Sequence, residues 1–232
     1  MALAIHSLNT NLRIIAGYES GRTIVFALNR AGIEHSALNR PELKWQKLYS
    51  AQPHSQPILS LSVSPSYDYY VTSSADAILA KHPLLSVETA FNPDTKPLKL
   101  LQTKHSGQQG LCIRSDGKVF STAGWDSRVR VYSAKSMKEL AVLKWHKDGC
   151  FATAFADVGN LETQGIKPET ASSSRISDEL VLARDDSPTS TDLPTPHSPA
   201  TTVSQRRDLK AQTTHWLAAG SKDGKVSLWD VF

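Results

Sequence analysis

The stretch from Gly124 to His146 combines Asp126, several serines and His146, the residue types that form the catalytic triad of a hydrolase. No nucleophile elbow accompanies them, since the segment Gly17 to Gly21 has the wrong spacing for Gly-x-Ser-x-Gly. The segment Gly220 to Lys225 lacks a second glycine at the spacing of a phosphate-binding loop, and it lacks the Lys-Ser/Thr pair. The eight histidines have no metal-ligand spacing with cysteine or carboxylate. The sequence therefore predicts no catalytic residue, no cofactor and no metal.

Composition sets the broad class of the 232-residue chain, which is 40% hydrophobic and has a formal net charge of +4. This mild basic excess does not by itself identify a partner. Cys112 and Cys150 lie far apart, as expected of reduced thiols in a nuclear or cytosolic protein. No stretch reaches the roughly 18 apolar residues that a membrane span needs. The N-terminus lacks the basic region of a signal peptide.

A pattern of strand, turn and strand recurs along the chain and is its strongest signal. The segment Trp216 to Gly220, an Asp-Gly turn, and Lys225 to Asp230 form the clearest copy, because Asp-Gly is typical of tight hairpins. The alternation Arg128 to Tyr132 follows a second such turn. Two further copies occupy residues 12–26 and 70–82. Each copy follows another strand-like segment and precedes a linker that can supply a fourth strand, so four units of four antiparallel strands are predicted.

These units resemble the WD40 repeat, most clearly from Ala219 to Asp230. The resemblance implies an all-β fold, a β-propeller of four-stranded blades. It also implies a buried network in which a turn aspartate braces an upstream histidine. By this resemblance Asp126 pairs with His105, Asp223 pairs with His146, and Trp229 completes the last unit. Tyr132 and His82 stand at the tryptophan position of units three and two, so their networks are expected to be incomplete.

Residues 157–214 interrupt the last unit with a segment rich in Ser, Thr and Pro that contains no aromatic residue. Such a segment cannot bury enough apolar surface to offset its ordering entropy, and it is predicted to be mostly disordered. The predicted organisation is residues 1–156 with three blades and the first strand of the fourth, then this insertion, then residues 215–232. Proline-directed phosphorylation sites are candidates at Ser187, Thr195 and Ser198, although the insertion could equally be a spacer.

A second variable stretch, Arg30 to Pro57, lies between units one and two. It contains Trp45, which could pack in the core or dock on a partner, with core packing the preferred interpretation.

Two segments are more specific than a general WD40 repeat: Thr122 to Val131, with its tryptophan in the turn, and Leu140 to His146. With Ala16 to Gly21 and Ala218 to Asp223, they are similar to the ASTRA-associated WD-repeat family, whose animal relatives are called G-protein β-subunit-like proteins. The resemblance implies a fungal, non-enzymatic adaptor that binds ASTRA complex subunits. It further implies roles in chromatin remodelling and in maturation of phosphatidylinositol-3-kinase-related kinases, in the nucleus and also in the cytoplasm.

A member of this family is expected to carry about seven blades, so the four units indicate an N-terminally shortened chain. Four blades leave two apolar faces open, and the chain alone is not expected to be a stable closed monomer. The alternative function is histone or nucleic-acid binding through a basic third unit, although direct nucleic-acid binding is not the expected function. The basic residues of that unit are Arg114, Lys118, Arg128, Arg130, Lys135, Lys138, Lys144 and Lys147.

Overall fold

The computed structural model describes residues 2–8, 11–29, 44–84, 96–158 and 202–231. The chain divides into two parts, residues 1–158 with 214–232, and residues 159–213, and each is described by itself. All strands of the described residues belong to the first part, and the second contains one helix, α1.

The strands form four antiparallel sheets, called blades 1 to 4, in which the strands are paired in chain order. Blade 1 consists of β1 (Ala2–Leu8), β2 (Asn11–Gly17), β3 (Thr23–Asn29) and β4 (Lys44–Ala51). Blade 2 consists of β5 (Ile58–Val63), β6 (Tyr69–Ser74), β7 (Ile78–Pro83) and β8 (Lys99–Gln102). Blade 3 consists of β9 (Gln108–Ile113), β10 (Val119–Gly124), β11 (Val129–Ser133) and β12 (Glu139–Leu143). Blade 4 has three strands, β13 (Cys150–Phe155), β14 (Trp216–Ser221) and β15 (Val226–Asp230).

The hairpin turn between the second and third strands is alike in every blade. One residue of each turn has a left-handed backbone, with φ between 64° and 78°: Gly21, Ala77, Ser127 and Gly224. In blade 1 this residue must be glycine, because a Cβ on Gly21 would lie 2.1 Å from the carbonyl oxygen of His54. Because the first strand of each blade runs antiparallel to the second, its start lies beside this turn. The turns and the starts of the first strands therefore share one edge of the stacked sheets.

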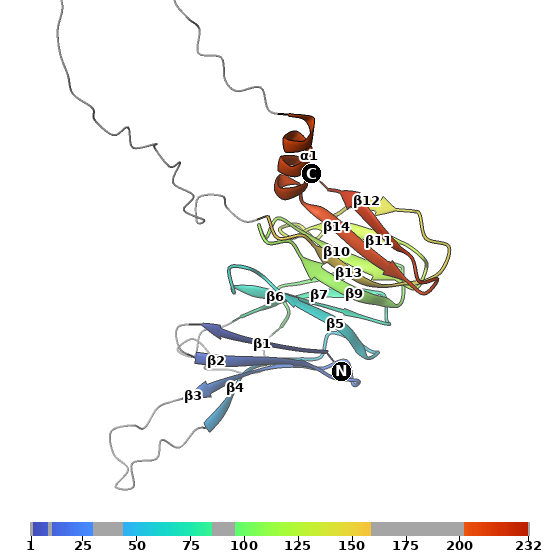
Figure 1. Ribbon diagram of the computed structural model, residues 1–232. Helices are drawn as coiled ribbons and strands as arrows, with labels where there is room; N and C mark the ends of the chain where they lie inside the picture. The colour runs from blue at the N-terminus through green and yellow to red at the C-terminus, as the bar shows by residue number, and fades with distance from the viewer. Residues whose placement is uncertain (1, 9–10, 30–43, 85–95, 159–201, 232) are drawn as a thin grey trace, which may run out of the picture. The chain divides into compact units, whose positions relative to one another are not determined.

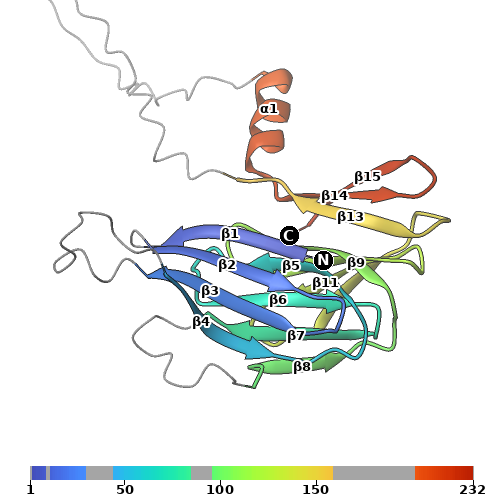
Figure 2. The ribbon, with the colours of Figure 1, turned by 90° about the horizontal axis from the view of Figure 1, so that it is seen from below.

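Consecutive blades pack face to face, and the first strands β1, β5, β9 and β13 are neighbours (Figure 1). The same succession of sheets is seen from below in Figure 2. Each junction between blades contains one hydrophobic cluster. Ile15, Val25, Tyr49 and Tyr70 join blades 1 and 2; Val71, Leu79, Phe120 and Tyr132 join blades 2 and 3; and Val129, Val131, Cys150 and Leu217 join blades 3 and 4. No cluster of the described residues joins blade 4 to blade 1.

Two blade faces therefore remain uncovered in the part of the chain that the structure describes. The face of blade 1 exposes Leu3, Ile5 and Trp45 and is hollowed by a pocket of about 350 Å³. That pocket is lined by Leu3, Ile14, Ala16, Tyr18, Phe26 and Trp45. The opposite face, on blade 4, exposes Val226 and Leu228, each about two-thirds accessible. Both faces present to solvent the kind of side chain that the three junctions bury.

The predicted all-β propeller fold is confirmed, with a last blade of three strands. The stretch Arg30 to Pro57 supplies the fourth strand of blade 1, β4, and Trp45 lies on that strand with about half of its surface exposed. Core packing of Trp45 was thus the wrong interpretation within these four blades. β13 and β14 are hairpin neighbours in space, since the Ala156 amide donates to the carbonyl oxygen of Trp216 over 2.8 Å.

The helix α1 (Val203–Thr213) was not expected, because it lies in the segment predicted to be mostly disordered. Its sequence combines Gln, Arg, Leu, Lys and Ala, which are strong helix formers. The exposed side chains along it show no apolar stripe, so intrinsic propensity rather than packing accounts for the helix. The patch Ile176 to Ala183, whose apolar periodicity predicts a transient helix, lies outside the described residues. Among the described residues, no helix has the length and apolar character to cross a membrane.

We expect the isolated chain to self-associate through its two uncovered faces, because exposed apolar surfaces and free strand edges recruit other chains. Replacing an exposed side chain on either face, by Trp45→Ser or Leu228→Ser, should lower the mass measured by light scattering without lowering the melting temperature. Leu140→Ser is the matched control, since Leu140 is exposed but lies on the outer strand of blade 3. A wild-type chain that is monomeric with one cooperative melt would contradict this expectation.

Candidate functional site

The most complete polar constellation of the fold is a chain of four hydrogen bonds at the face of blade 2 that contacts blade 1. His54 Nδ1 lies 3.1 Å from Asp76 Oδ1, and His54 Nε2 lies 2.8 Å from Thr72 Oγ1. Thr72 Oγ1 also lies 3.0 Å from His82 Nε2. His82 Nδ1 then lies 2.9 Å from the Tyr49 hydroxyl of blade 1. This chain links the hairpin turn of one blade to the outer strand of the other.

The aspartate fixes the direction of the first hydrogen bond, because a carboxylate only accepts and His54 must donate to it from Nδ1. When His54 is neutral, the other directions follow: its Nε2 accepts from the Thr72 hydroxyl, and Thr72 accepts from Nε2–H of His82. His82 Nδ1 then accepts from the hydroxyl of Tyr49. With both histidines neutral, every donor in the chain has an acceptor.

Burial favours the same neutral state. His82 is inaccessible to solvent, and this burial lowers its pKa from 6.5 to about 3. The pKa of His54 is also lowered by burial, and the neighbouring Asp76 carboxylate opposes this shift without reversing it. Asp76 is itself almost fully buried, and it further accepts from the amides of Ser55 at 2.8 Å and Ile78 at 3.0 Å. The carboxylate therefore holds the turn and the preceding loop together.

The order Asp76, His54, Thr72 reproduces the hydrogen-bond order of a catalytic triad. Its hydroxyl, however, already donates to one histidine and accepts from another, and Thr72 is inaccessible to solvent. A nucleophile must reach its substrate, so this geometry braces the blade and is not arranged for acyl transfer.

Blade 4 contains a similar but looser arrangement of the residues predicted there. His146 Nε2 lies 2.8 Å from Ser227 Oγ, which also accepts from Trp229 Nε1 at 2.9 Å. Asp223 Oδ1 lies 4.0 Å from His146 Nδ1, beyond hydrogen-bond distance, and accepts from the Lys225 amide at 3.1 Å instead. The structure thus brings His146, Asp223 and Trp229 together, with Ser227 as the link that the sequence interpretation left out.

Blade 3 uses an arginine where blade 2 uses a histidine chain. Asp126 accepts two hydrogen bonds from the Arg130 guanidinium, at 3.1 and 2.5 Å. His105 Nδ1 is farther from Asp126 Oδ2, at 3.7 Å, and its side chain is 40% exposed. Burial raises the pKa of the Asp126 carboxyl, but the bonds and charge of Arg130 outweigh it and the net pKa is lowered. Arg130, rather than His105, is therefore the main partner of Asp126.

This finding corrects the basic surface expected of unit three. Arg130 is buried and paired with Asp126, and Arg114 is buried with two bonds to Asp116 at 2.9 and 2.7 Å. Arg114 also donates to the carbonyl oxygen of Val231, which ties blade 3 to the end of blade 4. Neither guanidinium is available to a phosphate. The lysines of the set, at positions 118, 135, 138, 144 and 147, remain exposed.

The expectation that the network of unit two is incomplete is wrong. His82 has two ring nitrogens, so it can continue the hydrogen-bond chain on both sides, which an indole cannot. Its partner His54 was overlooked because it lies in a stretch without obvious repeat similarity. The spacing carries the signal: His54 precedes Asp76 by 22 residues, nearly the separation of His105 from Asp126.

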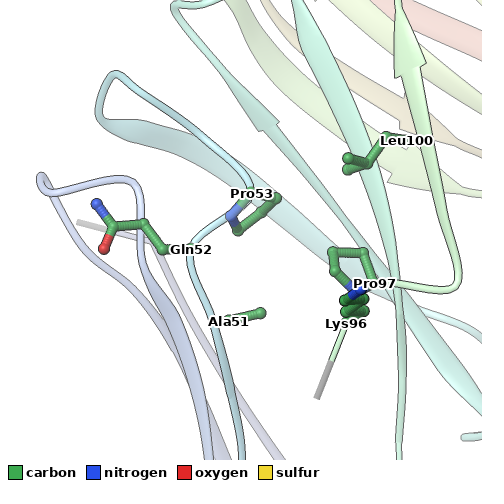
Figure 3. A pocket seen from close by; sticks show the side chains of 6 residues that line it. All are labelled: Ala51, Gln52, Pro53, Lys96, Pro97 and Leu100. Carbon is green, nitrogen blue, oxygen red and sulfur yellow. The ribbon is translucent and has the colours of Figure 1, made fainter. Parts of the chain in front are cut away.

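Outside the junctions between blades, a pocket of about 460 Å³ lies where β4 leads into blade 2 (Figure 3). Its lining is Ala51, Gln52, Pro53, Lys96, Pro97 and Leu100. The side-chain amide of Gln52 donates a hydrogen bond to the carbonyl oxygen of Ser20, at 2.9 Å. This lining contains no nucleophile and no acid–base pair. Among the described residues, no group of three or more potential metal ligands is found. The candidate phosphorylation sites Ser187, Thr195 and Ser198 lie outside the described residues.

We expect Asp76→Ala to destabilise the fold by about 1–3 kcal/mol, because it leaves buried donors without their acceptor. Asp223→Ala should cost less, since its carboxylate is 4.0 Å from His146 and its hydrogen bonds are to its own turn, with the amide of Lys225 and the side chain of Ser221. Urea denaturation at one pH measures both, with Asp148→Ala as the exposed control. If the two variants lose the same free energy of unfolding, the hydrogen-bond chain of blade 2 does not stabilise the fold more than the looser network of blade 4.

Stability should fall as the pH drops below about 6.5, well before the carboxylates titrate. His54 and His82 bind protons more readily in the unfolded chain, where the pKa is near 6.5, so their contribution is present above that value and is lost as the pH falls below it, toward about pH 3 for His82. A histidine that takes up one proton on unfolding adds a slope of about 1.4 kcal/mol per pH unit. His82→Gln should reduce the slope of the free energy of unfolding against pH, measured between about pH 7 and about pH 5. The reduction should correspond to about one fewer proton taken up on unfolding. An unchanged slope would mean that His82 is protonated in the folded state.

Comparison with known proteins agrees with this geometry. The family model described as "WD domain, G-beta repeat" matches residues 45–79, 95–133 and 195–230. A relative from Penicillium rubens, named ASTRA-associated protein 1, is 48% identical over 96% of this chain and 52% of its own length. Relatives of the same name from Aspergillus niger and Schizosaccharomyces pombe are 50% and 37% identical, over 95% and 64% of this chain and 50% and 39% of their own lengths.

The chain spans about half the length of these Penicillium and Aspergillus relatives. The resemblance inferred from the turn sequences is thereby confirmed. The chain belongs to the family of WD-repeat proteins whose curated members are named ASTRA-associated protein 1.

Proposed function

We propose that this chain is part of a non-enzymatic adaptor that holds protein subunits of an ASTRA assembly together. The observation that carries the proposal is the identity of about one half, over at least 95% of the chain, with relatives named ASTRA-associated protein 1. WD40 blades commonly serve as interaction platforms, but a fold alone does not define a function, so the proposal rests on these relatives.

The burial of the hydroxyl groups that could act as nucleophiles supports a non-enzymatic role. The hydroxyls that face histidines, Thr72 and Ser227, are buried and already engaged in two hydrogen bonds each. The pocket beside Leu100 offers packing surface and one lysine, which suits a binding contact better than a reaction. By the same resemblance, the proposed setting is the nucleus, with roles in chromatin remodelling and in maturation of phosphatidylinositol-3-kinase-related kinases.

Affinity purification of the full-length protein, tagged at its natural locus in a fungus, tests the adaptor role. A fixed set of protein subunits should elute in constant proportion from nuclear extract treated with nuclease. Recovery of the tagged protein alone, or a partner set that disappears with the nucleic acid, would contradict the proposal.

The absence of hydrolase chemistry can be tested separately with a fluorophosphonate probe, which labels a serine or threonine only when a base activates it and solvent reaches it. We expect no labelling of Ser227 or Thr72 in the folded chain, because both hydroxyls are buried. Trypsin, labelled in parallel, is the positive control. Labelling that is lost in Ser227→Ala would show a catalytic serine.

A further inference from the structure

One exposed tryptophan is held in place as firmly as a core residue. Trp125 lies in the hairpin turn of blade 3, with 48% of its surface exposed. Its indole Nε1 donates to Gln109 Oε1 over 2.8 Å, and its amide donates to the carbonyl oxygen of Gly107 over 3.0 Å. The ring lies against Gly107, where a Cβ would come within 2.2 Å of Cδ2 and Cε3. An aromatic side chain that is both exposed and fixed loses little entropy when a partner binds it.

The corresponding residue of other blades is small or polar. The amides of Ala75, Trp125 and Lys222 make the same hydrogen bond, to the carbonyl oxygen of a residue in the loop that precedes the blade. The backbone of the turn therefore does not require tryptophan. Fixing the indole does require the glycine at position 107, which has a left-handed backbone as well as no Cβ. The indole is thus a feature added to a turn that forms without it.

A second exposed aromatic ring and several lysines border this tryptophan. A Cβ on Gly149 would lie 3.1 Å from the carbonyl oxygen of Trp125 and 3.6 Å from Cε1 of Phe151, whose surface is 38% exposed. Lys222 adjoins the same glycine, because its amide donates to the Gly149 carbonyl oxygen over 2.9 Å. Lys104 and Lys147 are exposed in the two loops that flank the turn. We call this surface the Trp125 rim: Trp125, Phe151, Lys104, Lys147 and Lys222.

The charge of the Trp125 rim indicates that its partner carries negative charge. The turn carboxylates are each close to a cation: Asp126 is bonded to Arg130, and Asp223 lies 3.8 Å from Lys225 Nζ. The three exposed lysines then face Asp148, which is exposed and has no ion pair among the described residues. We propose that the Trp125 rim binds an acidic peptide segment that places a bulky apolar side chain against Trp125 and Phe151. This inference rests on the proposed adaptor function and names the chemistry of one of its contacts.

Single-stranded nucleic acid is the competing occupant, because aromatic rings flanked by lysines also stack bases. Two observations favour a peptide. Two of the three guanidinium groups of this blade, on Arg114 and Arg130, are buried in ion pairs and cannot contact phosphates, which leaves only the half-exposed Arg128. The exposed carboxylate of Asp148 lies at the same edge, where it would repel a continuous phosphate backbone more than a few acidic side chains.

The test is selection of a phage-displayed random peptide library on the full chain, immobilised at low density. The selected peptides should be enriched in Asp and Glu around one aromatic or aliphatic residue, and their binding, measured by fluorescence anisotropy, should weaken as salt rises. Trp125→Ala should weaken binding by about tenfold or more, Phe151→Ser should weaken it less, and Trp125→Phe should retain most of it. Trp45→Ala is the matched control, since Trp45 is equally exposed but lies on blade 1.

Charge reversal gives a second, independent measurement. Lys147→Glu with Lys222→Glu should weaken the selected peptides several-fold and flatten their salt dependence. Lys135→Glu with Lys138→Glu, at the opposite edge of blade 3, should not. A thermal melt of each variant separates lost binding from lost folding.

Three outcomes would overturn the inference: no enriched peptide, enriched peptides without acidic residues, or peptides that bind Trp125→Ala as tightly as wild type. Tighter binding of oligothymidylate than of any peptide, lost in Lys147→Glu with Lys222→Glu, would assign the rim to nucleic acid. Full-length protein that carries Trp125→Ala and still co-purifies every subunit would reject the Trp125 rim and leave the adaptor function standing. Wild-type protein that recovers no subunit would reject the adaptor function, whatever the peptides show.

Discussion

Face-to-face stacking of the blades is the constraint on which the rest of this structure depends. A four-stranded sheet that is apolar on both faces has no stable form alone in water, so each face needs a neighbour. Chain order supplies that neighbour, and the two faces of a blade differ accordingly. The face toward the following blade is mainly aliphatic or aromatic, as with Val71 and Leu79, with single hydroxyl contacts such as Ser121 to Thr153. The face toward the preceding blade also carries a buried polar network, which we call the brace, such as the histidine chain of blade 2. Such a stack has a direction, and its two ends are unlike surfaces.

The braces occupy equivalent positions in successive blades, but they are built from different residue types. Equivalent places on the preceding face hold a histidine chain in blade 2, an arginine–aspartate pair in blade 3 and a histidine–serine–tryptophan group in blade 4. Blade 1 has Ala16 and Phe26 at the positions of Thr72 and His82. A buried polar group is stable only when its partners are complete. The blade whose preceding face is uncovered here carries apolar side chains where the others carry a brace.

Blade stacking also explains which features of the fold can be predicted from the sequence. The hairpin of residues 216–230 is predictable because Asp-Gly and the alternation beside it are local signals. Alternation fails as a guide to exposure, however, because both faces of a propeller blade are buried. By period two, Arg128, which directly precedes β11, and Arg130 on that strand should be alike, yet Arg128 is half-exposed and Arg130 is buried between blades. His54 was missed for a related reason: its partner is fixed by stacking and turn geometry, and no local sequence pattern surrounds it.

Stacking also decides where this fold can vary without losing stability. Residues on the blade faces must fit a neighbour, and the residue at the left-handed turn position must accept that backbone. In blades 2, 3 and 4, the amide of the turn residue before the aspartate donates to a backbone carbonyl oxygen, so the turn does not depend on that residue's side chain. That position holds Glu19, Ala75, Trp125 and Lys222 in successive blades, four different chemistries on one backbone. An adaptor built from near-identical blades can distinguish partners only through such positions, so the specificity of this protein should be sought along that edge rather than in the buried networks that resemble catalytic sites.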